Sequence, residues 1–461
     1  MRHFGSLVVV TASLAGCAAD DTAGLRNLPA PPTTFIRAED APKTPVLARW
    51  WLAIDDTELT RLIELGLAQS PNVAAAEARL RQARAGLAGA KAGRLPALGG
   101  SALAARADVS GPLLGGNGPV ELYNLGFDAQ WELDLWGGQR RGVDKAKAGA
   151  DQAAAGLADA QVSLSAEIAR SYVVLRAREG EGRLLAQRHA LELRLLVMAK
   201  ARTAAGRVPQ MAVDAAAIQL DQTAAEQAFG QGEISALRDA LAAMTGQMPG
   251  ALDDLSMGKV PRPPVQVAIG DPAEMLARRP DMRAAEARLK AAVADVGMAQ
   301  VRRLPQVALL GMMGLGGPNL GDVVDPAQLS TLAIPRLTWN MLDFGRTAAN
   351  LRGARAGRDA EMAVYQASML NSLQDAEGAL ARFGAARQVA GRAAATVQHA
   401  EAIAAAQDLR AKAGVISVGE SLESQRKLID AQLAEGQMRG QWTVAYVSVA
   451  KALGLGWKDT P

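Results

Sequence analysis

Residues that could carry covalent chemistry are scarce in this chain of 461 residues. It contains one cysteine, Cys17, and three histidines, of which His3 lies at the extreme N-terminus. No histidine is grouped with acidic residues at the spacing of a metal site. No glycine-rich phosphate loop follows a predicted strand, because the run Gly-Gly-Asn-Gly at 115–118 falls between two strands. We therefore expect no enzymatic activity, no metal and no cofactor.

Cys17 ends a segment that has the features of a secretory signal. A basic start precedes the apolar stretch Leu7–Ala15, which is too short for a permanent membrane helix. The small residues before Cys17 resemble a bacterial lipobox, which implies cleavage after residue 16 and lipidation of Cys17. The alternative is an ordinary signal peptide with an incidental cysteine. Ala18 follows the cysteine, and the absence of aspartate there favours the outer membrane.

The composition favours long helices and argues against a nucleic-acid partner. Hydrophobic residues make up 49% of the chain but aromatic residues only 4%, which suits closely packed, alanine-rich helices. The formal net charge is +3, and basic and acidic residues are interspersed without a long basic run. No apolar run outside the signal reaches the length of a membrane-spanning helix, so a membrane role needs either the lipid or β-strands.

A long segment of the chain occurs twice. Residues 70–96 and 279–305 align without a gap at an offset of 209 residues, and both contain Ala-Ala-Glu-Ala-Arg-Leu and end in Arg-Leu-Pro. The offset is nearly half the chain, so we predict one structural unit duplicated in tandem. The predicted organisation is a signal peptide (1–16), a lipidated tether (17–48), a first repeat (49–246), a linker (247–272), a second repeat (273–456) and a tail (457–461).

Each repeat predicts a helix, two strands, a long helix, a tight turn and a second helix. The first repeat is predicted to contain helices 56–69, 73–93, 140–205 and 211–245, strands 97–109 and about 120–135, and a turn at 206–210. The second repeat is predicted to contain helices 281–302, 346–413 and 419–453, strands 306–315 and about 329–341, and a turn at 414–418. A loop is expected at 316–328, Gly180 and Gly182 are candidate bends, and Pro335 predicts a bulge or a strand end.

The clearest strand signal is a strict alternation from Tyr123 to Leu135. Odd positions are apolar or aromatic, and even positions carry Asn124, Asp128, Gln130 and Glu132 among them. The length matches a tilted strand that crosses a bilayer, with lipid on one side and water on the other. A soluble sheet with one buried face is the alternative. Since open sheet edges are not tolerated in hydrocarbon, four strands would have to be pooled from several chains.

The residues that carry a family resemblance are spread over the mature chain. They are Trp50-Trp51, Asp56, Leu62-Ile63, the run from Arg278 to Asp281, and the strand end from Trp131 to Gly137. Together with the duplication and the lipobox, they resemble the TolC-type outer-membrane factors, in particular the lipoprotein components of tripartite RND efflux systems. The resemblance implies a mainly α, α+β fold of the TolC type. It implies a homotrimer in which a twelve-stranded outer-membrane β-barrel continues into a periplasmic α-helical barrel.

The same resemblance implies an exit duct that passes through outer-membrane lipid. Its implied partners are a periplasmic adaptor and an inner-membrane RND-type transporter. The turns that close the duct and meet the adaptor would be Gly206–Pro209, including Arg207, and Gly414–Ser417. Each glycine is equally explained as a helix C-cap.

The second turn has carboxylates behind it. Glu420 and Glu423 lie on one helix face and align with carboxylates that ring the lumen of relatives. Three copies would favour cations, whereas ordinary solvated glutamates are the alternative. The residues that lock the gate in relatives are absent, and Asp408 and Arg410 are candidate substitutes.

Two other functions compete with the duct. A periplasmic adaptor lipoprotein is also lipidated and rich in helices, but it carries one helical hairpin between β-rich domains. A structural coiled-coil lipoprotein would show strict heptads and no amphipathic strands. The two long helical pairs and the strand pattern favour the duct over both.

Overall fold

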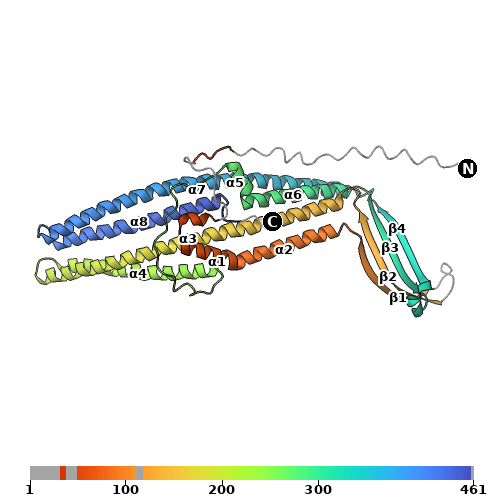
Figure 1. Cartoon of the computed structure of the whole chain (residues 1–461), viewed down its shortest axis with the longest axis horizontal. Coiled ribbons are helices and arrows are strands. Elements are labelled where there is room, and N and C mark those ends of the chain that lie inside the picture. The colour runs from red at the N-terminus through yellow and green to blue at the C-terminus, as the bar shows by residue number, and fades with distance from the viewer. Residues whose placement is uncertain (1–31, 38–48, 110–117, 458–461) are drawn as a thin grey trace. The chain divides into compact units, whose positions relative to one another are not determined.

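The computed structural model of the chain describes residues 32–37, 49–109 and 118–457 (Figure 1). Cys17, the signal segment and residues 110–117, which follow the first strand, lie outside these described residues. The chain forms two compact units, which we describe separately. Unit 1 includes Ala83–Asp151 and Ala285–Ala367, and unit 2 includes Pro32–Gln82, Gln152–Ala284 and Ser368–Pro461.

Unit 1 contains a four-stranded antiparallel sheet in the order β1-β2-β3-β4. The four predicted strands are confirmed: they are β1 (Ala97–Val109), β2 (Gly118–Leu133), β3 (Gln306–Gly317) and β4 (Leu329–Thr338). The two hairpins come from different repeats, so the β2–β3 pairing joins the repeats into one sheet. β1 and β4 are the edge strands within the chain.

The pairing register gives the sheet one continuous apolar face. Phe127 pairs with Met313, and Trp131 pairs with Leu309, which in turn pairs with Pro335. Phe127 remains 55% exposed, so none of the described residues covers this part of the face. Its apolar members are Leu98, Ala102 and Ala104 of β1, Tyr123, Leu125, Phe127, Ala129, Trp131 and Leu133 of β2, Val307, Leu309, Met313 and Leu315 of β3, and Leu329, Ala333, Pro335 and Leu337 of β4.

The opposite face is mixed. It carries Asn124, Asp128 and Gln130 together with apolar residues such as Leu332 and Ile334. The alternation of β2 therefore predicts the two faces correctly, whereas β3 and β4 add apolar residues to both.

Arg106 of β1 lies on the apolar face, near the end of the sheet. Its guanidinium is 3.1 Å from the carboxylate of Glu121, its register partner on β2, and Tyr123 donates a hydrogen bond to the same carboxylate. The charge on this face is therefore paired and sits beside an aromatic residue.

β2 and β3 approach each other closely at a pair of glycines. Gly126 lies opposite Gly314, and a Cβ at Gly126 would stand 2.6 Å from the carbonyl oxygen of Met313. A Cβ at Gly314 would stand 3.0 Å from the Cα of Gly126. Only glycine fits this backbone contact.

Pro335 does not interrupt its strand, so no bulge forms there, whereas the alternative prediction of a strand end near Pro335 is confirmed three residues on, at Thr338. The β3–β4 register runs unbroken through Leu309 and Pro335, and β4 ends at Thr338, three residues before the predicted end at 341. Proline is tolerated there because β4 pairs on one side only within the chain. The loop expected at 316–328 contains two short 3₁₀ helices, η4 (Leu320–Val324) and η5 (Pro326–Gln328).

Tryptophans secure the junctions between helix and strand in both repeats. The indole of Trp131 donates to the carbonyl of Arg94 at 3.0 Å, and that of Trp339 donates to Arg303 at 3.1 Å. Each acceptor is the arginine of an Arg-Leu-Pro segment. Trp136 donates to Pro305 at 2.6 Å. The repeated sequence therefore produces the same hydrogen bond twice.

The helices show the same duplication in their lengths. α2 (Pro71–Ala92) and α6 (Pro280–Val301) each have 22 residues, α3 (Gly138–Ala204) and α7 (Arg346–Lys412) each have 67, and α4 (Gln210–Met244) and α8 (Val418–Ala452) each have 35. At 1.5 Å per residue the two longest helices measure about 100 Å each. α3 is continuous through Gly180 and Gly182.

Acidic side chains cap the N-termini of the two longest helices, α3 and α7. Asp134 accepts hydrogen bonds from the backbone N–H groups of Gln139 and Arg140, both at 2.9 Å. Asp343 accepts from the N–H of Thr347 at 2.8 Å and from its hydroxyl. A negative charge at a helix N-terminus also complements the helix dipole.

Unit 2 has an aromatic and aliphatic core at the start of the first repeat. Trp50 packs edge-on against Trp51 and Tyr446, and the Tyr446 hydroxyl donates to the Trp50 carbonyl at 3.2 Å. Burial raises the pKa of Tyr446 to about 12. The helix α1 (Thr57–Gln69) covers this core with Leu59, Leu62 and Ile63, which are fully buried.

Besides η4 and η5, two short elements of unit 2 were not predicted from the sequence. η2 (Trp50–Ile54) precedes α1, and α5 (Pro272–Arg278) begins at the end of the predicted linker with Asp271 as its N-cap. Seven residues are too few for a helical period to stand out from a proline-rich segment.

Within the described ranges, no helix has the length and apolar character needed to cross a bilayer.

Candidate functional site

The two predicted turns, which we call the tips, have the same backbone geometry. At the first tip Gly206 has φ +70°, and the N–H of Arg207 donates to the carbonyl of Arg202 at 2.9 Å. At the second tip Gly414 has φ +73°, and the N–H of Val415 donates to the carbonyl of Arg410 at 2.9 Å. Both are Schellman motifs, in which a left-handed glycine ends a helix.

The tips differ in how the next helix begins. Pro209 precedes α4 and offers no side-chain cap. Ser417 caps α8: its hydroxyl accepts from the N–H of Glu420 at 3.2 Å, and Glu420 accepts from the N–H of Ser417 at 2.8 Å. This reciprocal pair is a capping box, which fixes the direction in which α8 leaves the second tip.

The capping box keeps Glu420 charged. Its hydrogen bonds from the backbone and side chain of Ser417 lower the pKa of the Glu420 carboxyl, and the charges of Arg410 and Arg202 add to this effect. Glu420 therefore remains ionised to a lower pH than an ordinary glutamate.

Two other carboxylates near the second tip pair along their own helices. Glu423 is 2.9 Å from Arg426 on α8, and Asp408 is 2.6 Å from Lys412 on α7. Asp408 is thus engaged within its helix, whereas Arg410 acts on Glu420 through its charge.

A cavity of about 700 Å³ lies behind the second tip. It is lined by α3, α4, α7 and α8, and both Glu420 and Glu423 face it. Large apolar side chains are exposed at the tips themselves: Met211 is 74% exposed, Val415 64% and Val418 56%. Apolar groups exposed together at a loop are typical of a surface that contacts another protein.

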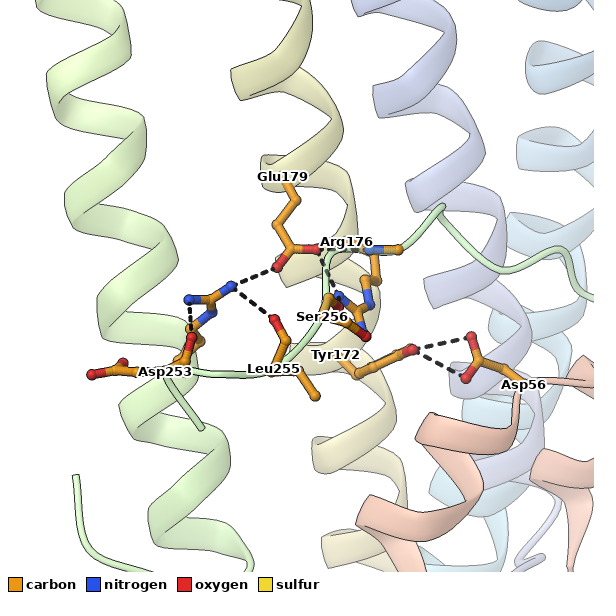
Figure 2. Close-up of polar contacts among 9 residues, drawn as sticks. Asp56, Tyr172, Arg176, Glu179, Asp253, Leu255 and Ser256 are labelled. Atoms are coloured by element: carbon orange, nitrogen blue, oxygen red, sulfur yellow. Dashed lines mark hydrogen bonds and ion pairs between the residues drawn. The ribbon is translucent and has the colours of Figure 1, made fainter. Parts of the chain in front are cut away.

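A buried ionic network fastens the segment 253–258 to α3 and α4 (Figure 2). Arg238 of α4 donates to the carbonyls of Asp253 and Leu255 and pairs with Glu179 of α3. Arg176 of α3 donates to the carbonyl of Ser256 at 2.6 Å and pairs with Glu179 at 2.7 Å. We call residues 253–261 the strap.

The Glu179 carboxylate is fully engaged in this network. It also accepts from the N–H of Gly258 at 3.3 Å. At the far end of the strap, the hydroxyl of Thr443 on α8 donates to the carbonyl of Pro261 at 2.8 Å. The strap therefore connects the α3–α4 hairpin to α8.

Tyr172, one turn before Arg176, extends the network to the start of α1. Its hydroxyl donates to both oxygens of Asp56, at 3.0 and 3.1 Å, as Figure 2 shows. Asp56 is also the N-cap of α1 through the N–H of Leu59. Burial is the main reason that the pKa of Tyr172 is raised, to about 12.

A described piece of the predicted tether docks on α7. The backbone N–H groups of Ile36 and Arg37 donate to the two carboxylate oxygens of Glu377, at 2.6 and 3.0 Å. Phe35 beside them is buried. The segment 32–37 is thus held by backbone hydrogen bonds to a side chain.

The strap network was not predicted from the sequence, although a signal for it exists. Leu164, Ile168, Tyr172 and Leu175 form a helical stripe, and Glu179 is its next member, four residues on. A carboxylate on an apolar stripe requires a buried partner, and Arg176 and Arg238 supply it. Among the described residues, no group of three or more His, Cys, Asp or Glu side chains is arranged to hold a metal.

Comparison with known proteins places the chain among outer-membrane channels. It is 30% identical over 94% of its length to the pyoverdine export outer membrane protein OpmQ of Pseudomonas putida, of which it covers 96%. It is 29% identical to the outer membrane protein OprJ of Pseudomonas aeruginosa, over 89% of this chain and 86% of OprJ. The solved structure of the outer-membrane channel OprN superposes with a TM-score of 0.85 at 30% identity, over 92% of this chain and 96% of that one.

The family comparison also detects the duplication. One family model, described as outer membrane efflux protein, matches the chain twice, over residues 62–247 and 272–455. The predicted TolC-type fold, the two tandem repeats and the outer-membrane location are confirmed. This chain belongs to the outer membrane efflux protein family, and its function is that of an outer-membrane efflux channel.

Proposed function

We propose that three copies of this chain form one exit duct for small molecules. The sheets would pool twelve strands into a barrel in the outer membrane, and the long helices would line a passage through the periplasm. The observation that supports this most directly is the sheet of unit 1, which has an uncovered apolar face and unpaired edges at β1 and β4. In hydrocarbon those edges would leave backbone groups unsatisfied unless β4 of one copy pairs with β1 of the next.

Aromatic side chains support the same placement. Tyr123 lies towards one end of β2 and Trp131 towards the other, which at about 3.3 Å per residue puts them about 26 Å apart. On a strand tilted by about 40° this separation corresponds to a height of roughly 20 Å, close to the apolar band of about 25 Å that lies between the aromatic girdles of membrane-spanning strands. Trp136 and Trp339 lie at helix–strand junctions at the same end of the sheet as Trp131, and they would lie at the periplasmic rim of the barrel.

The duct would work without catalysis, as a passive partner of two other proteins. An inner-membrane RND-type transporter would supply the energy, and a periplasmic adaptor would join it to the tips. Gly206, Arg207 and Pro209 at the first tip and Gly414 and Ser417 at the second would form the contact. The exposed Met211, Val415 and Val418 offer the adaptor an apolar surface. The relative OpmQ is named for pyoverdine export, and cargo choice here would belong to the transporter.

The second tip would form the gate. Glu420 and Glu423 from three copies would surround the narrow end and favour cations. Glu420 would dominate, because its lowered pKa keeps it charged while Glu423 is paired with Arg426. Arg410 would stabilise the gate through its charge interaction with Glu420. Asp408 would act only through its ion pair with Lys412.

Lipid on Cys17 would attach the duct to the inner face of the outer membrane. Glu377 would then hold the tether at Ile36 and Arg37, which are 19 and 20 residues along the chain from Cys17. An extended chain of that length spans up to about 60–70 Å.

The oligomeric state tests this proposal directly. We expect protein extracted from outer membranes in mild detergent to have the mass of three chains in multi-angle light scattering, after subtraction of bound detergent. The same preparation should form pores in planar bilayers. A monomer under these conditions, or a trimer without conductance, would contradict the proposal.

A further inference from the structure

The contact between α3 and α8 below the strap is an apolar seam with charged interruptions. Leu191 of α3 packs with Leu422 and Ile429 of α8, and these residues are buried. The seam is extended by partly buried neighbours, which are Leu184, Leu195 and Met198 on α3 and Leu433 on α8. On each helix these residues recur at spacings of three, four or seven, as in a coiled coil.

Each of the two helices carries one arginine at a position of the seam. Arg188 follows Leu184 by four residues and precedes Leu191 by three, so it lies on the side of α3 that forms the seam. Arg426 stands in the same relation to Leu422 and Ile429 on α8. A charged residue at a seam position lowers the stability of helix packing and ties it to one register.

Glu192 lies between these two arginines and is 2% exposed. Its Oε1 is 3.9 Å from Nε of Arg188 and 4.0 Å from Nη1 of Arg426. These are long ion-pair distances, and Oε1 accepts no hydrogen bond from the described residues. A buried carboxylate oxygen without a hydrogen bond is a costly arrangement.

Both arginines have a closer acidic partner on α8. Arg426 is 2.9 Å from Glu423, and Arg188 is 3.3 Å from Asp430. Three carboxylates therefore share two guanidinium groups, and the most buried carboxylate has the weakest contacts. With these five groups ionised, the cluster carries one surplus negative charge, and Glu192 is its member buried in the seam, since the side chains of Glu423 and Asp430 are 45% and 49% exposed.

Glu179, on the same helix, is a buried carboxylate with close partners for its charge. It has ion pairs at 2.7 and 3.2 Å and a backbone N–H donor. Glu192 is 13 residues further on, about 20 Å closer to the tip, and has none of these. The seam is thus held firmly at the strap and weakly between the strap and the tips.

Burial raises the pKa of the Glu192 carboxyl, and the charges of Glu423 and Asp430 raise it further against the opposing effect of Arg426 and Arg188. The other charged residues lining the adjacent cavity are Arg202, Glu420 and Lys427, and α4 and α7 contribute only uncharged residues to it. Since the folded-state pKa is raised, the seam is most stable below the ordinary pKa of glutamate. It loses that stability as the pH rises through the raised value.

We propose that Glu192 is a positioning residue for the periplasmic end of the duct. In its ionised form the surplus charge favours separation of the α3–α4 and α7–α8 hairpins below the strap, and in its neutral form the seam stays closed. This inference rests on the gate proposed above, and it adds a residue that acts on the tips from about 21 Å along α3.

The test compares pH profiles of single-channel conductance in planar bilayers for the purified, full-length lipoprotein, between about pH 5 and pH 8. We expect the wild type to open more as the pH rises, and Glu192→Gln to lose that rise. The variant Arg188→Leu/Glu192→Gln/Arg426→Leu, with a continuous apolar seam, should stay in the low-conductance state at every pH and melt at a higher temperature. Glu181→Gln is the matched control, because Glu181 pairs with Arg178 on α3 outside the seam.

The outcomes separate this inference from the proposed function. If wild type forms no pores at any pH, the proposed function itself fails. If wild type conducts and Glu192→Gln retains the same pH profile, the inference about Glu192 is wrong. A triple variant that opens as readily as wild type would also overturn it, whereas loss of the profile in Glu181→Gln as well would assign the effect to overall charge.

Discussion

Glu420 combines two roles in one carboxylate. Its carboxylate caps α8 through the N–H and hydroxyl of Ser417, and it carries a charge at the tip. Glutamine can replace glutamate in a capping box, because its side-chain oxygen also accepts a hydrogen bond. The cap and the charge can therefore be removed one at a time.

Two substitutions remove the charge and the cap separately. Glu420→Gln should keep the second tip intact but reduce the preference for cations, measured as reversal potential in a salt gradient across a planar bilayer. Ser417→Ala should keep the selectivity but destabilise α8 by about 1 kcal/mol, the usual cost of a lost N-cap. A lower melting temperature for Glu420→Gln with unchanged selectivity would show that the residue serves only as a cap.

The placement of Glu420 and Glu423 could be predicted from the sequence, whereas that of Glu192 could not. The spacing of Glu420 and Glu423 places them on one helix face, and they do line one cavity. The pattern Ser417-Val-Gly-Glu420 is itself the signature of a capping box. Glu192 could not be assigned from the sequence, because its environment is made by Arg426, which is more than two hundred residues away.

At the scale of elements, the repeat determines the junctions between helix and strand. Trp131 and Trp339 make equivalent hydrogen bonds to the two Arg-Leu-Pro segments, and Asp134 and Asp343 cap the two long helices. The aspartate caps are local in the chain, and each tryptophan bond stays within one repeat, so the sequence pattern could predict where the helical and strand segments meet.

Sheet packing depends on contacts between the repeats, as Gly126 illustrates. We expect Gly126→Ala to weaken the β2–β3 pairing by roughly 1–3 kcal/mol, because its Cβ would stand 2.6 Å from the Met313 carbonyl oxygen in a backbone contact that cannot adjust. The measurement is the temperature at which the detergent-solubilised oligomer dissociates on a native gel. Gly99→Ala is the control, since a Cβ there meets nothing within 4 Å. Equal effects of both substitutions would refute the packing argument.

For the whole molecule, family membership decides between the competing functions. Both repeats match the outer membrane efflux protein family, which excludes the periplasmic adaptor and the structural coiled-coil lipoprotein. The strap and the tether contact extend this picture, because they connect segments that lie far apart in the sequence. Pro261 meets Thr443, and Ile36 meets Glu377.

The lipid anchor can be tested independently of the channel. We expect mass spectrometry of the mature N-terminal peptide to show a chain that starts at Cys17 and carries acyl groups. Cys17→Ser should lose these groups and still enter the outer membrane, because the sheet would hold it there. An unmodified Cys17 in mature protein would favour the ordinary signal peptide.

The sequence by itself determined the repeat, the four strands, the long helices and the tips, because each follows from a periodicity or a turn residue within a short window. Only the tertiary structure decided which residues far apart in the sequence meet: Glu179 with Arg238 within the first repeat, and Gly126 with Gly314 and Glu192 with Arg426 across the repeats. Such pairs depend on register and helix rotation, which are set by packing over the whole molecule. The elements of the duct can thus be read from the chain, whereas the charges that would control its opening depend on how those elements pack.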